Sequence, residues 1–469
     1  MKKLLLGLTF LASSLSSIAQ VFPLDTLQNK GRRDNRINFV ILPDGFTASE
    51  QAFFVKKADT INQMVFSYHP LKQYQNFFNS YCIRVPSAES GVNHPATATD
   101  VTEVDPVMVV DNYFGSTFDN GGTHRALVVG KPAVAASVLA SNLPDYDICL
   151  VLSNTEMYGG TGGKYATGTL NKYAVKIAVH ELGHSFAGLA DEYWAGTYFA
   201  KEKPNMTAVT NPATVKWKNW LGYKSVGIYP YGTTSPASTW YRPHQDCMMR
   251  YLDTVLCPVC QQTFIDEIYN LVNPIDSVSI SKTAMKSALK DSVMITLNKL
   301  VKPNPNTLKV EWFVKGSLVA TGDTMLKVYS DTALSPSFDV NLVVTDTTAL
   351  SRSFWPKKGY QFSKTFTINV EKLGIKTIHD LGLSKFFYTV YPNPTVNHFY
   401  LSYEYSGTTE LAQLSVVDIL GKKLIDKQVN ILQGKHELAL DLSQLSAGTY
   451  FVQLNGQRVH VATKVQKNE

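Results

Sequence analysis

Two histidines and a glutamate stand close together in the stretch His180-Glu-Leu-Gly-His184. On an α-helix, residues four positions apart share a face, so His180 and His184 can direct two imidazoles at one metal ion. Glu181, next to the first histidine, would lie beside a water molecule bound to that ion. This is the H-E-x-x-H arrangement of zinc hydrolases, in which the glutamate is the general base. The pattern predicts a zinc site that activates water for peptide-bond hydrolysis.

The third metal ligand is expected shortly after the second histidine. A catalytic zinc ion usually takes three protein ligands and keeps one position for water. In the metzincin pattern the third ligand is a histidine six residues after the second, but here that residue is Ala190. Gly188 can end the helix in a left-handed conformation and return the chain toward the metal. We predict Asp191 as the third ligand with Glu192 as the alternative, and Tyr193 as an oxyanion donor or substrate contact.

The elements that must position these residues are visible upstream. The apolar run of residues 173–179 predicts a buried helix leading into the histidines, and Thr47-Ala-Ser-Glu50 fits a capping box that opens a helix to about residue 66. Buried strands are expected at residues 37–42, 81–85, 125–129 and 146–152, and a closing helix at residues 261–272. We predict an α+β, zincin-like (metzincin-like) catalytic domain over residues 20–275.

A glycine-rich stretch at residues 158–168 separates the last predicted strand from the metal helix. A phosphate-binding P-loop would need glycine at Tyr158 and serine or threonine at Tyr165, so that interpretation fails. Glycines let an extended backbone approach a ligand closely. The stretch therefore predicts a flexible segment that borders the cleft.

The pattern of hydrophobic and turn residues changes after about residue 276. Short alternating runs separated by turn residues are expected to form strands at residues 293–297, 308–314, 338–344 and 366–370. They predict an immunoglobulin-like β-sandwich over residues 276–375, which serves as a spacer or a binding module. Residues 385–469 carry a second series of short strands, and we predict a second all-β sandwich there.

Composition and the N-terminus limit the function classes. The chain has 469 residues, of which 44% are hydrophobic and 17% charged, as in folded multidomain proteins. Its net charge of +6 comes without a lysine- and arginine-rich block, so nucleic-acid binding is not predicted. Residues 1–19 predict a signal peptide, with Lys2 and Lys3, an apolar core and a cleavage site after Ala19. We expect an exported protein with no transmembrane segment after processing.

Three of the five cysteines lie close together in the sequence, namely Cys247, Cys257 and Cys260. Export permits disulfides. The Cys257-Pro-Val-Cys260 motif also resembles half of a zinc knuckle, but no second pair of cysteine or histidine residues completes it. The preferred prediction is a disulfide between Cys247 and one of the other two. Because five is an odd number, at least one thiol stays free or pairs with another molecule.

Two stretches carry family resemblances. The fourteen residues from His180 to Tyr193 resemble the signature of the IgA-peptidase family of bacterial zinc metallopeptidases, with supporting matches at residues 42–47, 86–91, 158–160 and 247–260. This resemblance implies a peptidase fold and dependence on zinc. Tyr391-Pro-Asn-Pro-Thr, Gly421-Lys-Lys and Gly448-Thr-Tyr-Phe-Val resemble the C-terminal sorting domain of type IX secretion. That resemblance implies transport across the outer membrane by the type IX machinery, followed by release or surface attachment.

Three functions compete at this point. The leading hypothesis is a secreted zinc endopeptidase that acts on extracellular protein or glycoprotein. A surface adhesin or glycan-binding protein with a peptidase-like fold is the main alternative, although a binding protein would not need Glu181. A zinc amidase acting on a non-protein amide would share the same metal chemistry.

Overall fold

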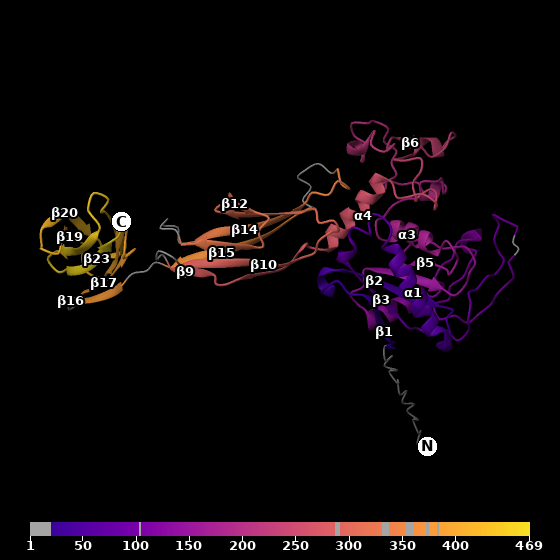
Figure 1. The fold of residues 1–469 in the computed structure, drawn as a ribbon, viewed down its shortest axis with the longest axis horizontal. Helices are drawn as coiled ribbons and strands as arrows, with labels where there is room; N and C mark the ends of the chain where they lie inside the picture. Colours follow the sequence, from indigo (N-terminus) through magenta and orange to yellow (C-terminus); the bar gives the residue numbers. More distant parts are fainter. Residues whose placement is uncertain are drawn as a thin grey trace, which may run out of the picture. The chain divides into compact units, whose positions relative to one another are not determined.

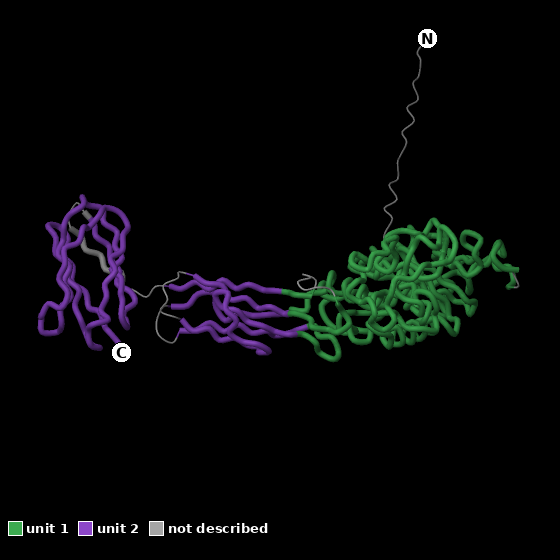
Figure 2. The backbone as a smooth tube through the Cα atoms, turned by 90° about the horizontal axis from the view of Figure 1, so that it is seen from above, with its two compact units in different colours: residues 1–276, 301–308, 345–362 green, residues 277–300, 309–344, 363–469 purple. Residues whose placement is uncertain are grey.

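The computed structural model describes residues 20–102, 105–286, 291–330, 337–352, 360–371, 375–381 and 384–469. The predicted signal peptide, residues 1–19, lies outside the described residues. The chain divides into two compact units, drawn in different colours in Figure 2. The first comprises residues 1–276, 301–308 and 345–362, and the second comprises residues 277–300, 309–344 and 363–469. Within the described residues, no helix combines the length and apolar character needed to span a membrane.

A five-stranded sheet runs through the first unit in the order β1-β3-β2-β4-β5 (Figure 1). Its strands are β1 (Leu24–Gln28), β2 (Ile37–Asp44), β3 (Phe78–Ile83), β4 (Ile148–Ser153) and β5 (Ala166–Gly168). Strands β3, β2, β4 and β5 are parallel, and β1 pairs antiparallel with β3 at the edge. All residues of β2 and β4 are buried, and this burial on both faces explains their continuous apolar runs.

Helices cover both faces of this sheet. They are α1 (Gln51–Val65), α2 (Pro132–Asn142), α3 (Ala174–Ser185) and α4 (Pro258–Leu271). Phe39 and Ile41 of β2 join a core with residues of α1, α3 and α4, whereas Val40 and Leu42 join a core with residues of α2. The alternation along β2 thus places the helix with the histidines, α3, on the same face as α1 and α4. The unit is a mixed α and β structure, and its zincin-like character remains a prediction.

Some predicted elements differ from the observed ones. Residues 125–129 form no regular strand; an isolated bridge joins Thr117 to Val128, and Leu127 packs in a small separate core with Val92 and Phe118. The apolar run therefore reflects local packing rather than a place in the sheet. The capping box is present, with the backbone N–H of Thr47 donating to Glu50 at 2.8 Å ahead of α1. Helix α2 and strand β5 were not predicted.

The turn after β2 fastens a long loop to the sheet. The Asp44 carboxylate is fully buried and accepts hydrogen bonds from the backbone N–H groups of Phe114 at 2.9 Å and Ser116 at 2.8 Å. Gly45 has a φ of +71°, and a Cβ there would lie 1.9 Å from the carbonyl oxygen of Gly91. Only glycine fits this position. The turn thereby anchors the loop region that continues to Arg125.

Two segments from beyond residue 276 complete the first unit. The carboxylate of Asp346 accepts hydrogen bonds from the hydroxyls of Tyr74 at 2.6 Å and Tyr269 at 2.7 Å. Burial, together with the charge of Asp346, raises the pKa of both tyrosines. The Tyr360 hydroxyl likewise donates to Asp266 of α4. Residues 301–308, 345–352 and 360–362 are therefore part of the packed structure that surrounds the sheet.

The second unit is built from strands. Two of its sheets have the orders β13-β10-β8 and β12-β11-β14-β15-β9. Their strands are β8 (Ile275–Ile280), β9 (Ala284–Lys286), β10 (Ser292–Leu300), β11 (Leu308–Val314), β12 (Ser317–Thr321), β13 (Met325–Tyr329), β14 (Ser337–Asp346) and β15 (Gln361–Glu371). The four strands predicted in this region fall within β10, β11, β14 and β15. Strands β11 and β12 form a hairpin through Lys315 and Gly316, both at positive φ.

The C-terminal region contains two four-stranded sheets, β16-β17-β18-β21 and β20-β19-β22-β23. The strands are β16 (Ile375–Leu381), β17 (Ser384–Tyr391), β18 (His398–Tyr405), β19 (Glu410–Val417), β20 (Lys423–Ile431), β21 (Gly434–Asp441), β22 (Gly448–Asn455) and β23 (His460–Lys467). Side chains from both sheets share one core. The strand-rich C-terminal half is confirmed, and the division into two sandwiches with boundaries near 275 and 385 stays a prediction.

Candidate metal centre

Three predicted ligands converge at the end of α3. The helix brings His180 and His184 onto one face, and their Nε2 atoms lie 3.1 Å apart. The Oδ1 atom of Asp191 lies 3.1 Å from Nε2 of His180 and 3.3 Å from Nε2 of His184. All three side chains are largely shielded from solvent. The three ligand atoms therefore form a small, nearly equilateral triangle.

The other ring nitrogens fix the orientation of the imidazoles. Nδ1 of His180 lies 3.0 Å from the carbonyl oxygen of Met248, and Nδ1 of His184 lies 2.9 Å from that of Leu189. A carbonyl only accepts, so each Nδ1 carries a proton, and each Nε2 is the ring nitrogen that faces the triangle. Backbone carbonyls in this role are typical partners of metal-binding histidines.

The triangle fits a zinc ion. Tetrahedral coordination with bonds of about 2.0–2.1 Å places neighbouring ligand atoms about 3.3–3.4 Å apart, close to the observed 3.1 to 3.3 Å. The centre also favours positive charge: burial lowers the pKa of His184, but Asp191 raises it more, to about 9. Two nitrogens and a carboxylate oxygen are ligands that zinc accepts. The donor set, the spacing and the electrostatics all suit a divalent cation.

Gly188 allows Asp191 to reach the histidines. Helix α3 ends at Ser185, and Gly188 adopts a φ of +62°, as predicted from the sequence. The N–H of Leu189 then donates to the carbonyl of Gly183 at 2.8 Å, which closes the helix end. This reversal directs the Leu189 carbonyl toward His184 and brings Asp191 to the ligand triangle.

Replacing Gly188 with alanine is expected to lower the free energy of unfolding by about 1–2 kcal/mol, because a Cβ at left-handed φ is strained. It should also weaken metal binding, because the same turn presents Asp191. Urea unfolding and zinc titration measure the two effects. Gly121 is a matched control, with a φ of +64° and, like Gly188, nothing within 4 Å of an added Cβ. Gly121→Ala should cost similar stability without changing zinc affinity; equal affinity in Gly188→Ala would contradict the role of the turn.

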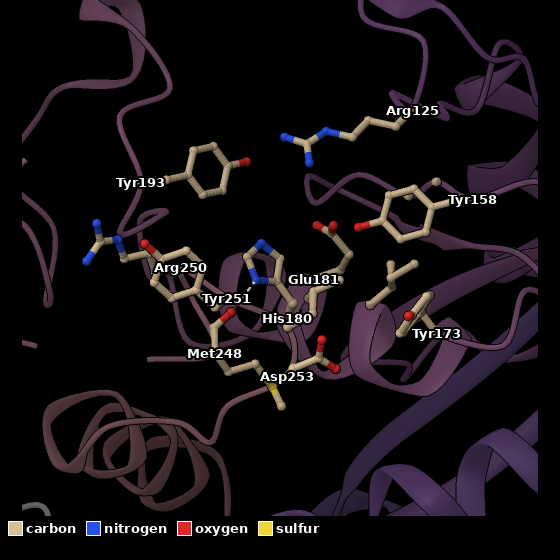
Figure 3. Close-up of a pocket in the computed structure, with 14 residues that line it drawn as sticks. Arg125, Tyr158, Tyr173, His180, Glu181, Tyr193, Met248, Arg250, Tyr251 and Asp253 are labelled. Carbon is tan, nitrogen blue, oxygen red and sulfur yellow. Dashed lines mark hydrogen bonds between the residues drawn. The ribbon is translucent and has the colours of Figure 1, made fainter. Parts of the chain in front are cut away.

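Glu181 stands at the edge of a cavity of about 550 Å³. Its side chain is largely buried, and burial raises the pKa of its carboxyl group. Its Oε2 atom has no hydrogen-bond partner among the described residues. In Figure 3 the hydroxyl of Tyr158 points toward this carboxylate, and the Arg125 guanidinium lies across the cavity from it. The carboxylate is thus free to bond to a molecule in the cavity.

Tyr193 also lines the cavity, on the side opposite Tyr158 (Figure 3). Burial raises the pKa of its hydroxyl, which therefore remains a hydrogen-bond donor at neutral pH. The guanidinium of Arg125 lies 5.7 Å from the centre of the Tyr193 ring. A donor hydroxyl and a cation thus face the same space as Glu181.

The glycine-rich stretch borders the site, as its sequence predicts. A Cβ on Gly162 would lie 2.6 Å from Cβ of His184 and 2.9 Å from Oε2 of Glu181. Gly159 and Gly160 line the cavity itself. Glycine at position 162 is what permits this backbone to lie against the metal helix.

Glu192, the alternative third ligand, turns away from the histidines. Its carboxylate is fully buried and lies with the thiols of Cys247, Cys257 and Cys260. All five cysteines are free, so the predicted disulfide is wrong. The Sγ atoms of Cys247 and Cys260 lie 3.8 Å apart, whereas a disulfide requires about 2.05 Å. Burial raises the pKa of Glu192 well above its usual range.

Several residues that line the cavity were not singled out from the sequence. They include Arg125, Arg250 and Tyr251. Arg250 and Tyr251 directly follow the Cys-Met-Met motif, which was a usable signal. Arg125 begins the apolar run of residues 125–129, whose pattern predicts a strand and gives no sign of a place in the cavity. No local pattern distinguishes such a residue, because its place depends on how a long loop folds.

Two parts of the chain match known protein families. Residues 26–227 match the family described as IgA Peptidase M64, and residues 389–468 match the secretion system C-terminal sorting domain. The first match indicates a peptidase of a metallopeptidase family. The second indicates export by type IX secretion, to the cell surface or the medium. No match is found among curated proteins.

Solved structures resemble parts of the chain only weakly. Dimeric latent PorU from Porphyromonas gingivalis is 12% identical over 41% of this chain and 20% of that chain, with a TM-score of 0.16. A tetra-tandem repeat from the extending region of a large adhesion protein is 14% identical over 41% of this chain and 48% of that chain, with a TM-score of 0.15. In both cases the match spans less than half of the other chain, and the scores are too low to carry an argument.

Proposed function

We propose that the chain is a secreted zinc-dependent endopeptidase that hydrolyses peptide bonds of extracellular proteins or glycoproteins. The observation that carries the proposal is the ligand triangle of His180, His184 and Asp191, which has the dimensions of a zinc site and adjoins a cavity. The free carboxylate of Glu181 faces the same cavity. Residues 20–275 would carry the catalytic site, together with the segments of residues 301–308, 345–352 and 360–362 that pack in the same unit. The rest of residues 276–375 would form a spacer or binding module, and residues 385–469 the sorting domain.

The protein's own groups divide the work of hydrolysis. When bound, zinc lowers the pKa of a water molecule and polarises the scissile carbonyl. Glu181 accepts a proton from the attacking water and later delivers it to the leaving amine. The raised pKa of this carboxyl group suits both steps, because it brings the protonated form closer to neutral pH. The lack of another hydrogen-bond partner leaves its Oε2 atom available for that water.

Tyr193 and Arg125 are suited to stabilise the negative charge that forms on the substrate during the reaction. As the water attacks, negative charge develops on the carbonyl oxygen, and donors preorganised around it lower the barrier. The Tyr193 hydroxyl keeps its proton, and the Arg125 guanidinium adds a positive charge on the same side of the cavity. We assign Tyr193 as the oxyanion donor and Arg125 as its positively charged neighbour.

Removal of the metal tests the proposal. The processed protein should hydrolyse a mixture of native and denatured proteins, lose this activity with a zinc chelator, and regain it when zinc is restored. Hydrolysis is measured by the appearance of new amino termini. Hydrolysis that persists undiminished after zinc has been removed would contradict the mechanism. A zinc-loaded protein that binds proteins or glycans without cutting them would favour the adhesin, and cleavage restricted to non-protein amides would favour the amidase.

A further inference from the structure

A second cluster of metal-binding side chains lies beside the candidate catalytic centre. Glu192, Cys247, Cys257 and Cys260 are each at most 3% exposed. Each offers one ligand atom, and these four atoms all lie within 4.8 Å of one another. The residues come from three segments: the loop after α3, the loop before α4, and the first turn of α4. Four donor atoms from three segments thus meet in the buried interior.

The distances within this cluster match a coordination sphere rather than a disulfide. The Sγ atoms of Cys247 and Cys260 lie 3.8 Å apart, and Oε1 of Glu192 lies 3.2 Å from Sγ of Cys260 and 3.9 Å from that of Cys257. Tetrahedral zinc with bonds of about 2.3 Å to sulfur and 2.0 Å to oxygen gives edges of about 3.8 Å between sulfurs and 3.5 Å between sulfur and oxygen. The cluster therefore has the size of a zinc site.

Without a cation, the buried carboxyl group of this cluster also lacks a full set of hydrogen-bond partners. Oε2 of the fully buried Glu192 has no hydrogen-bond partner among the described residues, although the side-chain amide of Asn205 donates to Oε1 at 3.2 Å. The N–H of Cys257 donates to Sγ of Cys247 at 3.3 Å, and Cys257 is the N-cap of α4. The positive end of a helix and an N–H donor both stabilise thiolate sulfur. Burying a charged carboxylate is costly unless it is protonated or paired with a cation.

We propose that Glu192, Cys247, Cys257 and Cys260 bind a second, structural zinc ion. Three thiolates and a carboxylate form a donor set that zinc favours, and four protein ligands leave no position for water or substrate. Binding releases the thiol protons to solvent and leaves the net oxidation state unchanged. The Cys257-Pro-Val-Cys260 motif is thus half of a zinc site whose other half is Cys247 and Glu192.

The second ion would hold the first centre in place. Glu192 directly follows Asp191, and Cys247 directly precedes Met248, whose carbonyl orients His180. The N–H of Glu192 already donates to the carbonyl of Met249 at 2.7 Å. A zinc ion bound by Glu192 and Cys247 would tie the loop that supplies the third ligand to the loop that supplies the orienting carbonyl. The cluster therefore acts as a positioning device for the catalytic metal.

Metal analysis of the processed protein tests this proposal. We expect two zinc ions per chain in the wild type, one in His184→Ala and one in Cys260→Ser. Cys149→Ser is the matched control, because Cys149 is also buried but lies in the core on the other face of the sheet. It should keep both ions. One zinc ion in the wild type and none in His184→Ala would overturn the second site. One ion that depends on Cys260 but not on His184 would support it and instead overturn the proposed function.

Cobalt substitution distinguishes the two sites by their ligands. Thiolates bound to Co²⁺ give intense near-ultraviolet charge-transfer bands, which a site of histidine and aspartate lacks. These bands should be present in the wild type, persist in His184→Ala and disappear in Cys260→Ser. Their absence from the cobalt-loaded wild type would overturn the proposal, even if Cys260→Ser fails to fold.

Thiol counting tests the alternative in which two of the cysteines form a disulfide. Denatured, chelator-treated wild type should react as five free thiols, the number of cysteines in the chain. A count lower by two, which returns to five after reduction, would indicate a disulfide and overturn the zinc site.

Discussion

Replacing Glu181 with glutamine is expected to lower kcat/KM by about 10²–10⁴-fold, the usual contribution of a general acid or base. Glutamine preserves the size of the side chain but cannot take a proton from water or return one to the leaving amine. Zinc content and thermal stability should stay close to wild type, because no ligand is removed. The measurement is steady-state hydrolysis of a fluorogenic peptide that the wild type cuts, together with metal analysis.

A matched control is available on the same domain. Glu156 is exposed, and the cavity lining does not include it. Glu156→Gln removes the same charge and should leave kcat/KM unchanged. Full activity in Glu181→Gln would contradict the assignment of the general base. A loss of zinc in that variant would show that Glu181 acts on the metal site instead of on the proton transfers.

Replacing Asp191 with alanine is expected to weaken zinc binding at the histidine site more than 10²-fold, since loss of even an outer-shell partner costs about 10–100-fold. The two imidazoles alone leave the ion without its charged ligand. Peptidase activity should fall in proportion to the zinc that is lost and recover in part at high zinc concentration. Competition with a chromophoric chelator gives the affinity.

Asp111 provides the comparison for this variant. It is an exposed aspartate, 3.6 Å from Lys131 in an ion pair at the surface. Surface ion pairs contribute little to stability, so Asp111→Ala should keep wild-type zinc affinity and activity. Unchanged zinc affinity in Asp191→Ala would show that another residue completes the centre.

The sequence indicated the part of the site that depends on local geometry. His180, Glu181 and His184 lie on one helix, so their common face follows from helical periodicity alone. Gly188 and Asp191 follow within seven residues of His184, and a single left-handed residue was enough to predict the return of the chain. Strands β2 and β4 were equally visible, because burial on both faces leaves a continuous apolar run.

The remaining features depend on contacts between distant residues. Glu192 joins cysteines that lie 55 or more positions away in the chain, and no spacing rule connects a carboxylate to them. Arg125 reaches the cavity through a loop that Asp44 anchors from the end of β2. Strand β5 has only three residues and gives too short a signal. Helix α2 is largely apolar, with little polar face to mark its period.

The described parts of two later segments, residues 301–308 and residues 345–352 with 360–362, extend the length of chain that the first unit needs in order to fold. A protein truncated at residue 275 would lose Asp276, which binds Arg36 through two hydrogen bonds at 3.0 and 3.2 Å, and would lose the acceptor for Tyr74 and Tyr269. We expect such a fragment to aggregate or to be degraded, whereas a fragment ending after residue 371 should remain folded. Heterologous production and trimming experiments should therefore treat the catalytic region and the loops of the following module as one cooperative unit.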